Sequence, residues 1–411
     1  MRTTRILIGC VVAGLTASVA FAGAAASEGE WPCFNGPNHD GRSPDTGLLK
    51  EWPQGGPKQL WKVDTIGKGF SSPSVSGGQV FITGDTGGKL MLFAFDLNGK
   101  AKWKAPVDNA WTSDPGGSRS SATIDGGKVY VLSGHGTLSC HSAKTGAKLW
   151  SRRMSEFGGR PHGWGYAESV LILGKLALAT PGGKNCIVAL DKATGETVWK
   201  STGFDGPAHY GSIFPFTFNK TPLLAAGTGG GIVCVSAQTG RVQWSDAFSA
   251  NNTANCPSPI YSGSHVFWAN GYGKGGVCLE LSPAAGRVSA RRAWTTRDMD
   301  CQHGGYIIDE GCIYGNNGGG WACLDLKSGR TKWNTRGVGK GSLCYADGML
   351  FLFSENGGEA GLATCSPDAL EMKGTFRVQG NGPSWAHPVV IGGRLYLRYD
   401  TNLYCFDVKA K

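Results

Sequence analysis

Short apolar runs alternate with turn signals along nearly the whole chain. Runs such as Val80–Thr83, Val129–Leu132 and Leu395–Arg398 alternate buried-type and polar-type positions, and a Gly-Gly pair precedes each of them. A period of two is typical of β-strands, and paired glycines are typical of the tight turns between them. The pattern predicts an all-β protein built from consecutive antiparallel strands.

One sequence unit recurs through the chain. The stretch Ala189–Trp199 consists of an apolar strand end, a turn closed by Thr194-Gly195 and a second strand that ends in tryptophan. Versions of it occupy Cys234–Trp244 and Leu324–Trp333. Each repeat is predicted to hold four antiparallel strands, with the Thr-Gly type of turn before the last strand.

The spacing of the terminal aromatic residues defines the architecture. They stand 39 to 50 residues apart, at Trp61, Trp103, Trp150, Trp199, Trp244, Trp294, Trp333 and, in degenerate form, Phe376. A period of roughly 40–50 residues with four strands is typical of a propeller blade. After Phe376 the chain has three strands left, and the strand at Gln59–Val63 has no blade before it. We therefore expect an eight-bladed β-propeller of four-stranded antiparallel blades, whose ring is closed by pairing of the N- and C-terminal strands.

The most visible residues of the repeat are expected to be structural. Glycine supplies the positive φ of the turn, and an indole fits between neighbouring blades because it is flat, apolar and carries one donor. The residues assigned to this blade motif are Trp61, Trp103, Trp150, Gly195, Trp199, Gly240, Trp244, Trp294, Gly329 and Trp333.

The N-terminus has the features of a secretory signal. Arg2 and Arg5 precede an apolar run that ends in small residues, and the A-x-A pattern puts the cleavage site between Ala22 and Ala26. Residues 1–26 are predicted to be a signal peptide, 27–57 a loop segment packed onto the propeller through Trp31, Phe34 and Trp52, and 58–411 the propeller. We expect a periplasmic or secreted protein. No other apolar stretch approaches the length of about 20 residues that a transmembrane helix needs.

The charge is modest and dispersed. The net charge of +10 falls to +8 once the leader with its two arginines is removed, and charged residues make up 17% of the chain. This balance favours a mild attraction to acidic polymers or anionic surfaces. A nucleic-acid site would need clustered basic residues with stacking aromatics, which the sequence lacks. A monomer is expected.

Twelve cysteines follow the leader, with no C-x-x-C and no adjacent pair. Seven sit at or near one recurring apolar strand position, where a thiol behaves as a small buried hydrophobe: Cys140, Cys186, Cys234, Cys278, Cys323, Cys365 and Cys405. The other five are Cys33, Cys256, Cys301, Cys312 and Cys344. Because an exported compartment permits disulfides, one or two bridges are expected among these five, with their pairing open.

The blade motif resembles the pyrroloquinoline-quinone-like (PQQ-like) repeat over essentially all of residues 58–409. That family includes quinoprotein alcohol dehydrogenases, the non-enzymatic propeller lipoprotein of the outer-membrane β-barrel assembly machinery, and exported bacterial proteins of unknown role. The leading segment Trp31–Pro44 looks like the start of the last group. The resemblance implies the fold and leaves the function open between these classes.

Propeller geometry indicates where a binding site would lie. Residues just before each first strand, and the loops joining the second and third strands, share one face at the mouth of the channel. Candidate ligand-binding residues at this rim are Arg119, His162, Trp164, His209, Tyr210, Asn270, His303, Asn317, Lys340, Trp385 and His387. Ser71, Ser72, Ser120, Asn255, Cys256, Gln302, Asp85, His135, Asn316, Glu355, Asn356 and Asp400 share these positions. Convergent polar groups favour binding, while water alone would satisfy an ordinary polar rim.

Three functions remain open from the sequence. The first is an exported, non-catalytic scaffold that binds a protein, peptide or envelope polymer on its loop-bearing face, without cofactor or metal. The alternative is a PQQ-dependent alcohol or polyol dehydrogenase; members of that family hold the quinone with Ca²⁺, a vicinal disulfide and a tryptophan floor. This sequence has no Cys-Cys pair and no evident Glu/Asn/Asp set. The third is a carbohydrate-binding propeller, which would need Trp111, Trp164, Trp268, Trp321 and Trp385 to line one groove. No nucleophilic hydrolase signature is present.

Overall fold

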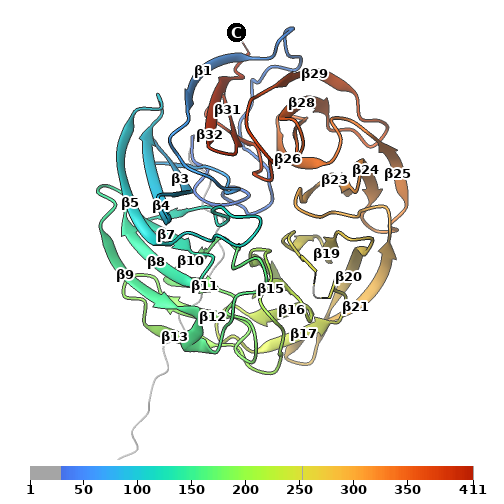
Figure 1. The fold of residues 1–411 in the computed structure, drawn as a ribbon. Helices are drawn as coiled ribbons and strands as arrows, with labels where there is room; N and C mark the ends of the chain where they lie inside the picture. The colour runs from blue at the N-terminus through green and yellow to red at the C-terminus, as the bar shows by residue number, and fades with distance from the viewer. Residues whose placement is uncertain (1–28, 252, 411) are drawn as a thin grey trace, which may run out of the picture.

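The chain folds into a ring of eight four-stranded antiparallel sheets around a central axis (Figure 1). The structure is a computed structural model, and it describes residues 29–251 and 253–410. Almost all regular structure is strand; a single turn of 3₁₀-helix, η1 (Met154–Phe157), follows the second blade. The predicted all-β fold and the predicted number of blades are confirmed.

Within each blade the strands follow one another in chain order from the axis to the rim. Blades one to four are β2–β5 (Ser74–Ser76, Gln79–Thr86, Lys89–Asp96, Ala101–Asn109), β6–β9 (Thr123–Asp125, Lys128–Leu132, Thr137–Ser142, Lys148–Arg153), β10–β13 (Leu171–Leu173, Leu176–Ala179, Val188–Asp191, Thr197–Lys200) and β14–β17 (Phe214–Phe218, Thr221–Thr228, Gly231–Ser236, Val242–Asp246). Blades five to seven are β18–β21 (Ile260–Ser262, His265–Asn270, Gly275–Ala284, Arg287–Thr296), β22–β25 (Tyr306–Asp309, Cys312–Asn317, Gly320–Asp325, Thr331–Thr335) and β26–β29 (Gly341–Ala346, Met349–Ser354, Glu359–Thr364, Met372–Arg377).

The eighth blade joins the two ends of the chain. It consists of β30 (Val389–Ile391), β31 (Arg394–Tyr399), β32 (Asn402–Asp407) and β1 (Lys58–Val63). β1 pairs antiparallel with β32. The predicted closure is therefore confirmed: β1 gives the last blade the fourth strand that the C-terminal end of the chain lacks.

Five of the terminal indoles pack under a glycine turn of the following blade: Trp61, Trp103, Trp150, Trp199 and Trp294. The Nε1–H of Trp150 donates to the carbonyl of Lys192 at 3.2 Å, beneath the turn that contains Gly195. Gly195 has a φ of +79°, and a Cβ built on it would lie 2.8 Å from the Trp150 ring. The turn therefore needs glycine both for its backbone conformation and for its close approach to the indole. The same N–H to carbonyl bond, at 2.8–3.2 Å, is made by Trp61, Trp103, Trp294 and Trp333.

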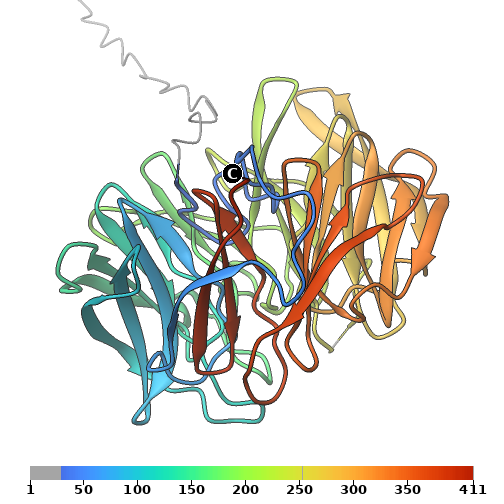
Figure 2. The ribbon, with the colours of Figure 1, turned by 90° about the horizontal axis from the view of Figure 1, so that it is seen from above.

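The N-terminal segment, residues 29–57, crosses one mouth of the channel. Trp31 exchanges backbone hydrogen bonds with Val75 of the first blade, and Gly41 accepts one from Tyr345 of the seventh. Arg42 pairs with Asp309 at the end of β22. All three contacts lie in or at the ends of the innermost strands, on the side away from the segments that enter those strands. Figure 2 shows this blue segment at one face of the ring, beside the C-terminus.

The cysteines of the described residues do not form the disulfide bridges expected from the sequence. All twelve in the described residues are free thiols, so the one or two bridges expected among Cys33, Cys256, Cys301, Cys312 and Cys344 are absent there. These five lie in the N-terminal segment, before β18 and β22, and within β23 and β26, each buried or half-buried in its own packing environment. In five blades the cysteine opposite the terminal tryptophan is Cys140, Cys234, Cys278, Cys323 or Cys405. Cys186 and Cys365 lie beside that register, because Ala189 and Ala360 take it.

The predicted signal peptide lies outside the described residues. Among residues 29–251 and 253–410, no helix has the length and apolar character needed to cross a membrane.

The glycine turn can be tested with a matched pair of variants. Gly195→Ala combines a positive φ with a clash against Trp150, whereas Gly286→Ala, at the tip of the β20–β21 hairpin, has a φ of +70° and no atom within 4 Å. We expect Gly286→Ala to cost about 1 kcal/mol of unfolding free energy, and Gly195→Ala to cost about 1–3 kcal/mol more, by urea denaturation. The excess should disappear in a Trp150→Ala background. Equal costs for the two variants would contradict the proposed contact.

Candidate functional site

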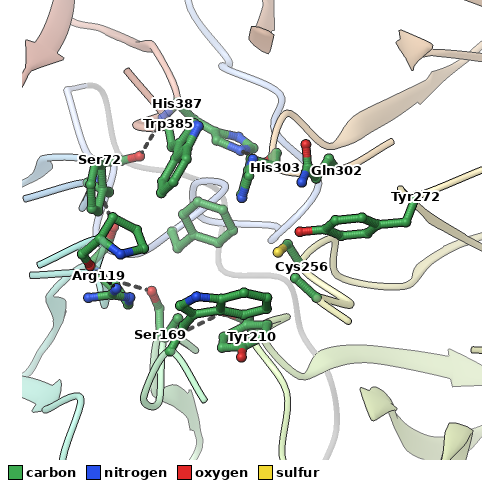
Figure 3. A pocket seen from close by; sticks show the side chains of 18 residues that line it. Ser72, Arg119, Ser169, Tyr210, Cys256, Tyr272, Gln302, His303, Trp385 and His387 are labelled. Atoms are coloured by element: carbon green, nitrogen blue, oxygen red, sulfur yellow. Dashed lines mark hydrogen bonds between the residues drawn. The ribbon is translucent and has the colours of Figure 1, made fainter. Parts of the chain in front are cut away.

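The segments that lead into the innermost strands converge on the axis and enclose a cavity of about 260 Å³. Seven of the eight blades contribute lining residues, and Phe34 of the N-terminal segment contributes another. Figure 3 shows the labelled side chains around the opening, with Trp385 and His387 across from Tyr210 and Ser169. The cavity is near the lower end of the size range of small-ligand pockets.

A belt of serines holds these segments together. Ser72, Ser121, Ser169, Ser212 and Ser258 each stand two residues before the first strand of a blade. Each serine from Ser72 to Ser212 donates its backbone N–H to the Oγ of the next at 2.9–3.0 Å, and His387 N–H donates to Ser72 Oγ at 2.8 Å. The belt fixes the backbone of six neighbouring blades around the cavity.

One wall is a column of stacked rings. Trp385 lies between Phe70, at a centroid distance of 4.5 Å, and His303, at 4.2 Å and nearly parallel. Behind His303, Glu355 Oε2 lies 3.8 Å from His303 Nδ1, and Glu355 Oε1 lies 3.1 Å from Lys340 Nζ. Burial lowers the pKa of His303, although Glu355 opposes this shift. Burial would raise the pKa of Glu355, but His303 and Lys340 outweigh it and the net shift is downward. Glu355 is therefore a carboxylate already committed to two partners.

The facing wall is built from Trp164 and Tyr210, with two histidines behind them. The Tyr210 hydroxyl lies 2.5 Å from His162 Nδ1, and the His162 ring lies 4.5 Å from that of His209. His209 Nδ1 accepts hydrogen bonds from Asn255, which leaves its proton on Nε2. Burial lowers the pKa of His209 to about 4, so the ring is neutral at physiological pH. The histidines support the wall, and neither lines the cavity.

The inner end of the cavity is closed by the N-terminal segment. The Phe34 ring lines the cavity and lies 4.9 Å from the His387 ring in an edge-on contact. His387 Nε2 donates to the carbonyl of His303 at 3.0 Å, and burial lowers the pKa of His387 to about 4. Because the segment carrying Phe34 binds across the opposite mouth, the pocket is open toward the loop-bearing face and closed behind.

Arg119 brings the positive charge at the pocket wall. Its guanidinium donates to the carbonyls of Gly117 and Pro115 and lies near the faces of Phe70 and Trp111. Burial lowers its pKa to about 10, which leaves it charged at neutral pH. Asp85 lies behind it, and burial raises the pKa of that carboxyl to about 6. No Asp or Glu is among the residues that line the cavity.

The structure brings together about half of the rim residues proposed from the sequence. The six that line the cavity are Arg119, Trp164, Tyr210, His303, Trp385 and His387, with Ser72, Cys256 and Gln302 from the wider set. His162, His209, Asn270, Asn317 and Lys340 do not line it. Asn270 is fully buried, and Asn317 accepts a hydrogen bond from Asp300 N–H.

Sequence reasoning missed several lining residues. Phe70 and Tyr272 line the cavity, the latter from the β19–β20 loop. The serine belt had a usable signal, since its members recur at one position before the first strand. The proposed carbohydrate groove is wrong: Trp268 and Trp321 are fully buried in the blades, so the five tryptophans cannot share a groove.

The pocket does not fit a quinone held with Ca²⁺. Calcium needs six to eight oxygen ligands, with carboxylates among them, yet no carboxylate of the described residues lines the pocket and Glu355 behind the wall pairs with Lys340. No group of three or more His, Cys, Asp or Glu residues able to hold a metal occurs in the described part of the chain. The free, separated cysteines also provide no vicinal disulfide.

Comparison with known proteins gives one family match and several matches of fold. Residues 94–335 match the family model described as "Outer membrane protein assembly factor BamB". Among solved structures, BamB from Moraxella catarrhalis is 14% identical, with a TM-score of 0.62 over 86% of this chain and 98% of that one. A europium-containing methanol dehydrogenase is 12% identical (TM-score 0.69, 90% and 89%), and the quinohemoprotein alcohol dehydrogenase of Comamonas testosteroni is 14% identical (0.66, 95% and 82%). No curated protein matches the sequence. At these identities the structural likeness establishes the fold alone.

A buried acid lies directly behind the serine belt. Glu168 is 1% exposed and stands one residue before Ser169. One of its oxygens accepts the backbone N–H of Thr180, and Oε2 has no hydrogen-bond partner among the described residues. Burial raises the pKa of Glu168 to about 7, despite the opposing effect of Thr180. The folded state therefore favours the protonated carboxyl.

The protonation of Glu168 predicts a pH-dependent stability. The pKa of Glu168 is higher in the folded chain than in the unfolded chain. Its protonated carboxyl therefore contributes its full stabilisation below the pKa of the unfolded chain, and this stabilisation is lost as pH rises through about 7. A Glu168→Gln variant should gain on the order of 2–3 kcal/mol of unfolding free energy relative to wild type between pH 5 and pH 9. Urea denaturation across this range measures it. The exposed Glu196→Gln is the control, and a Glu168→Gln difference that does not vary with pH would contradict the buried acid.

Proposed function

The chain belongs to the family described as outer membrane protein assembly factor BamB, and we propose that it acts as an exported, non-catalytic propeller that binds a protein, peptide or envelope polymer on its loop-bearing face. The partner inserts one group into the axial pocket. The ring supplies a rigid platform, and the loops that enter the innermost strands supply the contacts.

The axial pocket is the observation that carries this proposal. It is open toward one face, closed behind by Phe34, and lined by aromatic rings and a few polar groups from seven blades. Concave sites with apolar walls and a few convergent polar groups are the usual form of a binding site. Aromatic side chains also provide large contact areas at protein interfaces.

The chemistry of the wall supports binding without catalysis. The pairing of His303 with Glu355 could orient a base, but the ring is stacked on Trp385, and the nearest thiol in the lining, Cys256, has its pKa raised to about 12 by burial. A thiol with a raised pKa is a poor nucleophile. The metal-dependent quinone reaction of the dehydrogenase relatives lacks its ligand set here.

Two features support action in the envelope. Residues 1–26 have the composition of a secretory signal. The net positive charge of the chain without its leader favours approach to anionic surfaces and polymers.

A site-specific photo-crosslinker tests the proposal. Tyr272 is 50% exposed and lines the pocket, so a benzoylphenylalanine there should capture a discrete envelope partner in cells of the source organism. Val198, which is 54% exposed on the outer strand β13, is the matched control and should not capture it. A Trp385→Ala substitution should abolish the product from position 272.

The outcomes separate the proposal from its alternative. The same product from positions 198 and 272, or no product at either, would contradict a partner at the pocket. A quinoprotein dehydrogenase would instead be stabilised by pyrroloquinoline quinone in a Ca²⁺-dependent way, by about 2.7 kcal/mol at a hundredfold excess over Kd. We expect no such shift in thermal unfolding, and a clear one would replace the proposed function.

A further inference from the structure

The uncommitted polar groups of the axial pocket are mainly hydrogen-bond donors. Ser72, Ser121, Ser169 and Ser212 line it, and each Oγ already accepts a backbone N–H. No hydrogen bond among the described residues uses these four hydroxyls as donors, so their protons can face a ligand. Gln302 also lines the cavity; it accepts from Lys340 through Oε1, and its amide N–H groups are donors beside Tyr272. A ligand with acceptor groups can pair with these protons.

The charge of the lining selects an anion. Arg119 is the charged residue in the wall, and no carboxylate faces it across the cavity. Two of its N–H groups bind the carbonyls of Gly117 and Pro115, and a guanidinium has five donors, so three remain. Behind the wall, Lys340 neutralises Glu355 and the fully buried Arg398 lies near Asp85. Arg119, with Asp85 and Arg398 behind it, is therefore the group placed to pair with one anionic group of a ligand.

The walls select a flat ring. The Phe70–Trp385–His303 column and the wall of Trp164 and Tyr210 both line the cavity, and Figure 3 shows Trp385 and His303 across the opening from Tyr210. Aromatic rings in such walls favour offset or edge-on contact with another aromatic ring. A sugar would also stack on tryptophan, but it carries no negative charge to pair with Arg119.

The closed inner end limits how a ligand enters. Phe34 and the segment that carries it block passage through the ring, so a polymer cannot thread the channel. The cavity of about 260 Å³ admits a free small molecule or the end of a chain. Either would place its ring between the aromatic walls and its anionic group toward Arg119 and the serines.

We propose that the axial pocket binds an aromatic carboxylate, a flat ring next to one carboxyl group, without a metal ion. This inference rests on the proposed function, because it names the chemistry of the group that the pocket receives. The same chemistry has two sources, a free aromatic acid and the aromatic C-terminal residue of a peptide.

Calorimetric titration of the mature chain tests the ligand class with matched probes. N-acetyl-phenylalanine and 3-phenylpropionate should bind, and N-acetyl-phenylalaninamide, which lacks the carboxylate, should bind at least tenfold more weakly. Phenethylamine should not bind. A pentapeptide with a C-terminal phenylalanine that binds tenfold more tightly than 3-phenylpropionate identifies a chain end as the source, and the reverse order identifies a free acid.

Variants locate the carboxylate. Arg119→Gln should weaken N-acetyl-phenylalanine at least tenfold, while Arg119→Lys retains most of the affinity because it keeps the charge. Trp385→Leu should weaken both acids and leave the preference for acid over amide. The control Arg291→Gln, an exposed arginine on the β20–β21 hairpin, should bind like wild type. Thermal unfolding of each variant confirms that it is folded.

Two results would overturn the inference. Equal affinity for the acid and the amide would show that the pocket does not recognise the carboxylate. Undiminished binding by a folded Arg119→Gln variant would show that the ligand does not bind at the proposed site. If no aromatic acid binds while the crosslink at position 272 persists, the ligand class is wrong and the binding propeller stands. If both fail, the proposed function fails as well.

Discussion

The packing of a terminal indole under the next blade's glycine turn, made by five of the blades, is the contact on which the ring mainly depends. At Trp150 and Gly195 the indole N–H reaches a carbonyl of the neighbouring turn, and the absence of a Cβ lets the ring approach. Repeated around the molecule, the contact sets the spacing between blades, and the pairing of β1 with β32 completes the circle. Because the outer strands fix the ring, the segments near the axis are free to vary in sequence. Their variation builds the pocket.

The segments around the axis need hydrogen-bond partners of a different kind. Eight chain segments meet at the axis, where backbone groups at the strand ends need partners away from the sheets. Serine at one repeated position supplies them, from Ser72 round to Ser258. The serine hydroxyl accepts a neighbour's N–H and keeps its own proton for the cavity. The N-terminal segment then closes the far mouth with Phe34 and gives the channel an end.

The fold could be predicted because its signals repeat. The terminal tryptophans and the Thr-Gly turns recur at fixed positions in the repeat, so many copies support one architecture. The last repeat lacks its fourth strand, and this gap predicts the pairing with the N-terminal strand. The site does not repeat: Trp164, Arg119 and Trp385 each occur in a single blade, and their convergence depends on loop conformations that carry no period. His162 and His209 share the predicted rim position but turn behind Trp164 and Tyr210, because their nitrogens bond to Tyr210 and Asn255. Phe34 reaches the cavity from a segment far from the other lining residues in sequence, and only the tertiary structure reveals that approach.

A crystal structure of residues 27–411 with N-acetyl-phenylalanine is the most direct test of this binding site. We predict that the carboxylate lies within hydrogen-bonding distance of Arg119 and the serine hydroxyls. The phenyl ring should lie between Trp385 and Trp164, above Phe34. Such a structure would establish that the pocket, closed at its inner end, receives one group of a partner. An occupied site elsewhere on the ring, with the axial pocket holding only water, would contradict it.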